Sequence, residues 1–404
     1  MNKNWKYKKI SEVMSVERGG SPRPIQKYLT DSKDGINWIK ISDATASDKY
    51  IYKTKQKITK EGLHKTRLVT EGDFLLSNSM SFGRPYIMKT TGCIHDGWLV
   101  LKEKEHNILD KDFLYHLLGS PYIFEQFDKL AAGSTVRNLN IKLVSSVEIP
   151  ILPVQEQKQI VEILDKAFSA IDQAKANIEK NIVNAKELFQ SKLNAIFSQK
   201  GDGWEEKTFQ ELSTRIGDGL HGTPKYDSNG DYYFINGNNL NDGKIEIKVN
   251  TKKVNKEEFE KHKKILTQNT VLVSINGTLG KVAFYNDEPV ILGKSACYIN
   301  FNKEVNKHYI KYLVKSSIFF KNMVSLSTGA TIKNFSLKSM RNYTLYLPSL
   351  IEQETRVNQL NNIEKRISKV ESNYYKQLKD LEELKKSILQ KAFSGELTQK
   401  EVVV

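Results

Sequence analysis

The sequence predicts an α/β fold with a pseudo-two-fold internal repeat, in which two similar mixed α/β domains are separated by two long antiparallel coiled-coil helices. Three observations predict this fold. The second half of the chain repeats motifs of the first, each half begins with short strand-like runs, and each half ends in a long stretch with heptad spacing. Solenoid repeats are only about 20 to 50 residues long, so a repeat of half the chain indicates two copies of a domain-plus-helix unit.

The internal repeat rests on short motifs that recur in the same order. Trp5 recurs as Trp204, and Glu156-Gln157 recurs as Glu352-Gln353. Further matches pair residues 133–139 with 329–335 and residues 187–198 with 383–394. A chain with approximate two-fold symmetry suits a partner that is itself two-fold, such as duplex DNA or a pair of identical proteins.

A proline divides each repeat into a domain and a helix. The domains end at Pro153 and Pro348, and the pattern of the residues that follow changes abruptly. From 154 to 199 there is no Gly or Pro, which favours one uninterrupted helix. The expected segments are a first domain over 1–153, a first long spacer helix over 154–199, a second domain over 200–348, and a second long spacer helix with the C-terminal tail over 349–404.

Within each domain, short apolar runs bounded by Gly, Asn, Asp and Ser predict the strands of a small sheet. One helix is expected to follow these strands in each domain, over 112–130 and over 307–326. The strand-like runs are residues 38–41, 74–76 and 98–101 in the first domain and residues 232–235, 271–273 and 297–299 in the second.

Apolar residues recur at heptad spacing in both long stretches, which predicts helices with a coiled-coil seam. Two seams of equal length in one chain favour an antiparallel pair, and such a rod would be roughly 70 Å long at 1.5 Å per residue. The alternative is that each apolar stripe packs on its own domain. The seam residues, which are also the candidate contacts to partner proteins, are Leu164, Ile171, Ile178, Leu360, Ile367, Tyr374, Leu381 and Ile388.

The chain carries a formal net charge of +15, and both halves are basic. This charge indicates a polyanionic partner, because neutralised phosphates release condensed counterions; a generally lysine-rich protein is the alternative. A membrane partner is not expected, because no apolar run approaches the roughly 18 residues of a span and the first residues lack the apolar core of a signal peptide. Cys93 and Cys297 have no CxxC spacing, which favours free thiols in a reducing cytoplasm.

The sequence contains no recognisable catalytic or metal-binding motif. Residues 217–222 match GxGxxG spacing, but Thr223-Pro224 follows where a phosphate-binding helix would have to begin. Walker, HExxH, GxSxG and amino-methyltransferase motifs are absent, and the histidines do not cluster at ligand spacing. No carboxylate pair recurs in both halves. We therefore expect no catalytic residue, no metal site and no cofactor in this chain.

The candidate contacts to nucleic acid lie mostly in polar loops that differ between the domains. Arg reads guanine, Asn reads adenine, and Ser or Thr donates to phosphate or to base edges. Arg137 and Lys333 keep a basic charge in both copies of one motif, which favours a phosphate clamp; equally, Thr135 and Asn138 could cap a local turn. For every candidate the alternative is a polar loop that merely faces water. The candidates are Arg23, Lys40, Ser77, Asn78, Ser81, Arg84, Thr135 and Arg137 in the first domain, and Lys225, Asn236, Asn238, Ser274, Asn276, Lys281, Thr331 and Lys333 in the second.

The duplicated half-unit resembles the specificity (S) subunit of type I restriction-modification systems. No single motif is specific to that family, but the duplicated order of the motifs is. One departure is that residues 197–201 do not repeat the Phe-Ser-Gly-Glu-Leu of the C-terminal copy, in a segment that serves as a linker. The motifs that carry the resemblance are residues 38–43, 72–77, 133–139, 156–157 and 383–397.

The resemblance implies two target-recognition domains, each reading one half of a bipartite, asymmetric site in double-stranded DNA. The helices would set the spacing and dock two modification subunits, which are adenine-N6 methyltransferases that bind S-adenosylmethionine. Restriction subunits with endonuclease and translocase activity, which use ATP and Mg, would complete the complex. Three alternatives stay open: an enzyme with an unrecognised site, a non-catalytic coiled-coil scaffold with basic nucleic-acid-binding heads, and a specificity subunit of a related restriction system.

Overall fold

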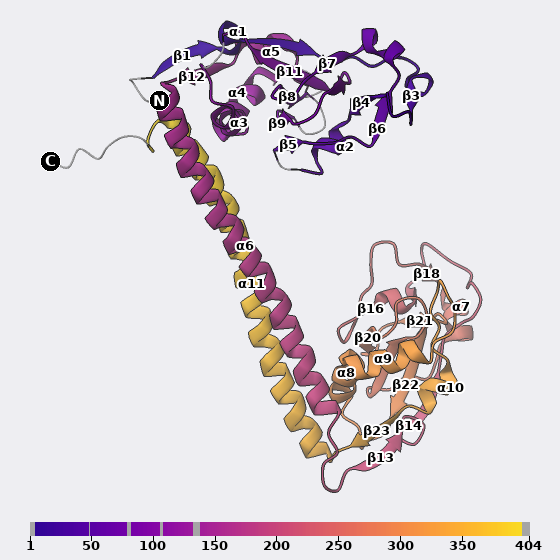
Figure 1. Cartoon of the computed structure of the whole chain (residues 1–404). Coiled ribbons are helices and arrows are strands. Elements are labelled where there is room, and N and C mark those ends of the chain that lie inside the picture. Colours follow the sequence, from indigo (N-terminus) through magenta and orange to yellow (C-terminus); the bar gives the residue numbers. More distant parts are fainter. Residues whose placement is uncertain (1–4, 48, 79–81, 106–107, 132–137, 398–404) are drawn as a thin grey trace, which may run out of the picture. The chain divides into compact units, whose positions relative to one another are not determined.

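The computed structural model describes residues 5–47, 49–78, 82–105, 108–131 and 138–397. It divides into two compact units, unit 1 (Met1–Ile178 with Lys376–Val404) and unit 2 (Glu179–Tyr375). Each unit holds one mixed α/β domain and part of both long helices, α6 (Val154–Phe197) and α11 (Leu350–Ser394) (Figure 1). The expected α/β class, with two similar domains and two long paired helices, is confirmed.

The domain of unit 1 contains two five-stranded sheets and a two-stranded ribbon. Its short helices are α1 (Ile10–Val13), η1 (Ile25–Lys27), α2 (Ile41–Ala44), η2 (Lys60–Lys65), α3 (Lys111–Leu118), α4 (Pro121–Ala131) and α5 (Ile141–Ser146). In sheet order, the strands are β3 (Leu29–Thr30), β6 (Gln56–Ile58), β4 (Ile36–Ile39), β10 (Gly92–Ile94) and β7 (Arg67–Val69); then β2 (Met14–Arg18), β11 (Trp98–Glu103), β8 (Phe74–Ser77), β9 (Pro85–Met88) and β5 (Tyr50–Ile51); and the ribbon of β1 (Lys6–Lys9) and β12 (Glu148–Ile151).

The domain of unit 2 repeats this arrangement with fewer strands in the two larger sheets. Its short helices are η3 (Gly237–Asn239), α7 (Lys256–His262), α8 (Lys307–Lys315), α9 (Ser317–Ser325) and α10 (Leu337–Arg341). In sheet order, the strands are β14 (Ser213–Gly217), β22 (Ala296–Phe301), β19 (Thr270–Ser274) and β20 (Val282–Phe284); β18 (Lys253–Val254), β15 (Tyr232–Ile235) and β21 (Val290–Leu292); and the ribbons of β13 (Glu205–Thr208) with β23 (Thr344–Leu347) and β16 (Leu240–Asn241) with β17 (Lys244–Ile245).

The strand register identifies equivalent strands in the two domains. The parallel pair β4–β10 of unit 1 corresponds to the parallel pair β15–β21 of unit 2, and the ribbon β1–β12 corresponds to β13–β23. In both domains the longest strand, β11 or β22, runs antiparallel between its two neighbours. The sequence repeat is therefore also a repeat of topology.

Two helices replace each of the single helices expected near the end of a domain, so that prediction is wrong in this detail. The breaks lie at Ser120 and Ser316, whose hydroxyls accept hydrogen bonds from the N–H groups of Ile123 and Phe319. A serine in this position starts a new helix by capping its first turn. The first strand also lies two residues earlier than expected, because β4 spans Ile36–Ile39 and α2 begins at Ile41.

Each domain builds its hydrophobic core against the end of a long helix. In unit 1, Phe393 near the end of α11 is fully buried, and its ring meets that of Phe113 on α3 at 5.5 Å. In unit 2, Leu193 of α6 is fully buried in the domain core, and Phe197 contacts Tyr309 at 4.9 Å. The repeated residues at the ends of both helices are therefore core residues.

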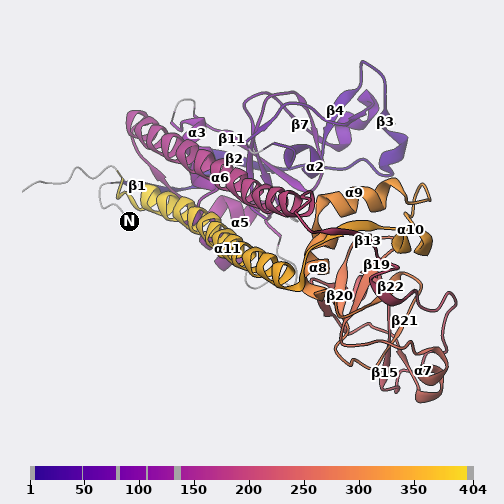
Figure 2. The same cartoon turned by 90° about the horizontal axis from the view of Figure 1, so that it is seen from below.

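The long helices run side by side and antiparallel in each unit, as both views show (Figures 1 and 2). In unit 1, Lys175 of α6 pairs with Glu382 of α11, and the Lys385 ammonium lies 4.8 Å from the Phe168 ring. In unit 2, Arg356 of α11 donates to Gln199 at 3.1 Å. No helix in the described part of the chain is both long and apolar enough to cross a membrane.

None of the predicted seam residues is exposed. Three of them are buried and the others are half-buried, which is what a two-helix pair can cover. The buried ones are Leu164, Ile171 and Leu360, and the half-buried ones are Ile178, Ile367, Tyr374, Leu381 and Ile388.

Candidate nucleic-acid interface

The most strongly repeated polar residues fasten each domain to its helix. In unit 1 the indole N–H of Trp5 donates to Glu156 at 3.0 Å, and Gln157 is fully buried. The Gln157 amide donates to the carbonyls of Ile108 and Leu152 at 2.8 Å and accepts from the N–H of Asp110 at 2.7 Å. A buried amide with all of these bonds satisfied holds the start of α6 in one orientation.

In unit 2, equivalent hydrogen bonds hold the domain to the start of α11. Trp204 donates to Glu352 at 3.0 Å. The buried Gln353 donates to the carbonyls of Glu304 and Pro348 and accepts from the N–H of Asn306 at 2.8 Å. These repeated motifs are therefore structural, and the parts that can differ in recognition lie elsewhere in each domain.

A tight turn follows β8 in unit 1 and β19 in unit 2, and it places one basic residue at its end. The Ser77 hydroxyl accepts from the N–H of Arg84 at 3.0 Å, and the Ser274 hydroxyl accepts from the N–H of Lys281 at 2.8 Å. Gly83 and Gly280 have φ of 73° and 77°, which favours glycine in the left-handed region.

The two serines are fully buried, so their hydroxyls support the turn and do not reach a surface. Asn78 is also buried, and its amide donates to the carbonyl of Asp96 at 2.8 Å. Arg84 is exposed, with its guanidinium 5.4 Å from the Tyr86 ring, and Lys281 is half-exposed. Of this group, Arg84 and Lys281 can meet a ligand.

The structure brings two of the predicted loops of unit 2 together. The N–H of Gly277 donates to the carbonyl of Lys333 at 3.0 Å, and the amide of Asn276 lies 3.4 Å from Asn334 Oδ1. Thr331 and Lys333 are exposed beside this contact. Asn276, Lys281 and Lys333 therefore belong to one turn-and-loop surface.

A second backbone contact between these loops is common to both units: the N–H of Leu139 donates to the carbonyl of Asn78 at 2.9 Å in unit 1, and the N–H of Phe335 donates to the carbonyl of Ile275 at 2.8 Å in unit 2. Ser81, Thr135 and Arg137 lie outside the described residues.

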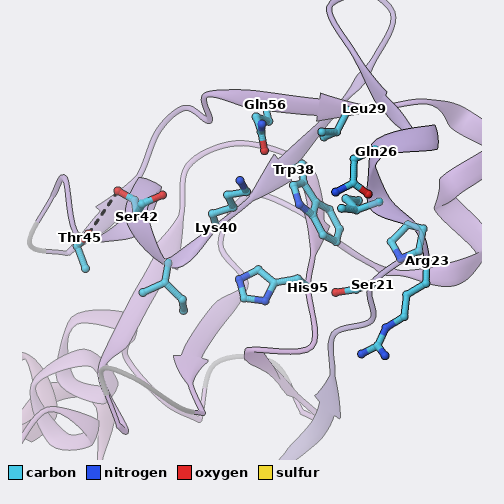
Figure 3. A pocket seen from close by; sticks show the side chains of 13 residues that line it. Ser21, Arg23, Gln26, Leu29, Trp38, Lys40, Ser42, Thr45, Gln56 and His95 are labelled. Atoms are coloured by element: carbon cyan, nitrogen blue, oxygen red, sulfur yellow. Dashed lines mark hydrogen bonds between the residues drawn. The ribbon is translucent and has the colours of Figure 1, made fainter.

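The remaining candidates border a different part of each domain. In unit 1, the carboxylate of Asp43 accepts a hydrogen bond from the backbone N–H of Lys40 at 2.9 Å, at the start of α2. In unit 2, the side chain of Asn239 accepts the equivalent bond from the backbone N–H of Asn236 at 3.0 Å, at the start of η3. Arg23 and Lys40 both line a cavity of about 920 Å³ (Figure 3). Asn238 and Lys225 are exposed.

The Asp96 carboxylate of unit 1 lies beside a hydroxyl and a guanidinium. A hydrogen bond from Ser21 at 2.8 Å lowers the pKa of the Asp96 carboxyl, and the Arg23 guanidinium lies 3.7 Å away. No cluster of three or more His, Cys, Asp or Glu side chains suited to a metal ion occurs among the described residues. The polar surface therefore offers hydrogen bonds and positive charge for binding.

His95 and the exposed phenylalanines of α4 and α9 were not among the residues predicted from the sequence. His95 follows a strand with no motif around it. Phe124 and Phe320 occupy equivalent positions in the two repeats, so their shared aromatic character was a signal in the sequence.

The family model for the type I restriction modification DNA specificity domain matches the chain twice, over residues 2–183 and 201–380. The chain belongs to this family. The recognition of a specificity subunit from its duplicated motifs is thereby confirmed, and the family description is of a DNA specificity component.

Curated relatives carry the same description. The specificity subunit of the type I restriction enzyme EcoBI of Escherichia coli is 22% identical over 98% of this chain and 86% of its own length. That of StySPI from Salmonella potsdam is 25% identical over 73% of this chain and 67% of its own length.

Solved structures share the fold of the whole chain. A chain from a structure of a type I R-M system aligns with a TM-score of 0.72 at 17% identity, covering 98% of this chain and 99% of that one. The HsdS subunit of Thermoanaerobacter tengcongensis aligns with a TM-score of 0.59 at 17% identity, covering 98% of both chains.

Proposed function

We propose that this chain is the specificity subunit of a type I restriction-modification complex and that each domain reads one half of a bipartite, asymmetric DNA site. The long helices set the distance between the half-sites and help to dock two adenine-N6 methyltransferase subunits. The methyltransferase subunits bind S-adenosylmethionine and methylate the adenines. The restriction subunits cleave DNA in a reaction that uses ATP and Mg. This chain supplies recognition.

One observation carries the proposal: both units hold a basic residue by the same serine hydrogen bond after an equivalent strand, yet the other polar side chains of the two domains differ. The turn places Arg84 in unit 1 and Lys281 in unit 2 at its end, which suits phosphate contacts that position a duplex without specifying its sequence. In another part of each domain the polar side chains differ, as in the exchange of Lys40 for Asn236. Two recognition domains that are related by pseudo-two-fold symmetry but carry different side chains suit an asymmetric DNA site.

Methylation mapping tests the proposal directly. DNA would be sequenced from cells that express this chain with and without its modification partner. We expect a split adenine-methylation motif that appears only when both proteins are present. Methylation by this chain alone would contradict the assignment, because it would require a catalytic site in this chain.

A repeated exposed surface supports two identical partner subunits. Phe124 on α4 and Phe320 on α9 are each 46% exposed, and Leu130 and Leu326 are 42% and 51% exposed at equivalent places. Exposed apolar side chains that recur in two otherwise divergent domains suit a protein that binds both domains in the same way. We assign this surface to the modification subunits.

Replacing both Phe124 and Phe320 with aspartate is expected to weaken binding of the modification subunit by roughly 30-fold or more, because a buried aromatic contact at an interface contributes about 2 kcal/mol or more. Co-purification and methylation rate would both report the loss. Ile265→Asp is the control, since Ile265 is 72% exposed and belongs to neither α4 nor α9. Unchanged assembly in the double variant would rule this surface out.

A further inference from the structure

The cavity of about 920 Å³ in unit 1 has an aromatic wall and a basic rim. The rings of Trp38 on β4 and His95 after β10 border it, with centroids 6.1 Å apart. Lys40 lies on one side of the indole, and Ser21 and Arg23 lie on the other (Figure 3). A cavity of this size can hold a nucleotide, and aromatic walls with cationic rims suit unstacked bases and their phosphates.

The 2.9 Å hydrogen bond from Gly97 favours one tautomer of the His95 imidazole, although Asp96 Oδ1 also lies 3.8 Å from Nδ1. The backbone N–H of Gly97 donates to Nδ1 at 2.9 Å, so Nε2 carries the proton of the neutral ring. Burial lowers the pKa of His95 from its usual value, which favours this neutral form at pH 7. Nε2–H has no acceptor within the described ranges of the chain, which leaves a fixed donor beside the cavity.

Arg23 at the rim can exchange its present partner for a phosphate. Its side chain is 84% exposed, and its guanidinium lies 3.7 Å from Asp96. An exposed ion pair of this length is weak, so a phosphate can replace the carboxylate at little cost. Lys40 forms no ion pair with another described residue and adds a second positive charge to the cavity.

Unit 2 fills the corresponding place with its own side chains. The strand register equates Trp38 with Phe234 and His95 with Gly293. A Cβ added at Gly293 would lie 2.9 Å from the Phe234 ring and 2.1 Å from Asn236 Oδ1. The space that the His95 side chain takes in unit 1 is therefore occupied in unit 2, so the two domains differ at this point.

We propose that the cavity binds one unstacked nucleotide of the DNA half-site that unit 1 reads. The base lies in the cavity beside the small exposed part of Trp38 and accepts a hydrogen bond from His95 Nε2–H, and its phosphate lies beside Arg23 at the rim. This inference rests on the proposed function and extends it, because unit 1 then reads one position by extruding a base. Extrusion costs stacking and pairing energy, which a mismatched base pair has already lost.

The test measures binding of the full chain with its modification partner to duplexes that carry the mapped methylation site. Each position of the unit 1 half-site is mismatched in turn by changing only the opposite base. We expect one position at which the mismatch tightens binding about tenfold, because the cost of extrusion falls. A half-site in which every mismatch weakens binding, in a complex that still methylates the matched site, would overturn the inference.

Two independent variants tie the effect to the cavity. His95→Asn keeps an acceptor for the N–H of Gly97 but removes the Nε2 donor, and Trp38→Phe installs the residue of unit 2. Both are expected to abolish the tenfold gain. His221→Asn is the matched control, because it makes the same change at an exposed histidine of unit 2, and it should keep the gain.

A third arm separates DNA from a free nucleotide. The chain without DNA is titrated with dAMP, dGMP, dCMP and TMP while its tryptophan emission is followed. We expect no saturable change below millimolar concentration, since the proposed base arrives tethered to DNA; micromolar binding would assign the cavity to a free nucleotide instead. If the complex showed no sequence preference on matched duplexes, the proposed function itself would be wrong. If it preferred the matched site but no mismatch tightened binding, only the inference about the cavity would be wrong.

Discussion

Replacing Phe393 with alanine is expected to destabilise unit 1 by about 3 to 5 kcal/mol, as the loss of a buried phenylalanine typically does. Phe393 is fully buried and packs on Phe113, although the whole second domain lies between the two residues in the sequence. Its removal leaves a cavity in the core of the first domain. Hydrogen exchange with mass spectrometry would show faster exchange in the strands of unit 1.

The matched variant is Phe197→Ala, which removes the equivalent residue at the end of α6. Because Phe197 packs on Tyr309, we expect faster exchange in unit 2 and none of the change in unit 1. Phe197 is only half-buried, so its effect should be smaller. If Phe393→Ala loosened only the helix end and left the domain strands unchanged, the role of α11 in the core of unit 1 would be disproved.

Exchange of residues 1–153 for the first domain of another family member is expected to change one half of the methylated motif and to leave the other half intact. On the original site, methylation should fall roughly 100-fold or more, since each mismatched base pair costs about 1 to 3 kcal/mol. The junction can accept a new domain, because Gln157 fastens it mainly through backbone groups. Methylation mapping of the chimera measures both halves at once.

The reciprocal exchange of residues 200–348 is the control, and it should change only the other half. A donor domain should keep a tryptophan equivalent to Trp5 and an apolar partner for Phe393, because both meet the retained helices. A chimera that is folded and methylates DNA, but whose motif changes in both halves, would contradict the assignment of one half-site to each domain.

The helical parts of the fold could be predicted because their signals are local. The stretch from 154 to 199 has no helix breaker and a regular apolar spacing, and the structure forms α6 over Val154–Phe197. The expected single helix over 307–326 is wrong, since Ser316 caps a second helix inside it. A serine within a helical pattern can be either a surface residue or a helix cap. The backbone conformation around Ser316 makes it a cap, and the sequence pattern does not specify that conformation.

The candidate DNA contacts were less predictable, because a polar side chain in a loop can face outward or inward. Ser77 and Ser274 recur in the two repeats, and both are buried under a turn. Arg84 and Lys281 recur beside them and reach the surface. Sequence repetition alone did not separate a residue that supports the turn from one that the turn presents.

The sequence by itself determined the duplication, the α/β class, the two long helices and membership of the specificity-subunit family, because periodicity, helix breakers and repeated motifs are written along the chain. The tertiary structure decided what depends on contacts between distant residues. Phe393 enters the core of the first domain because α11 runs antiparallel to α6, and Trp38 meets His95 because β4 pairs with β10. Such contacts follow from strand register and helix direction, which no local pattern specifies.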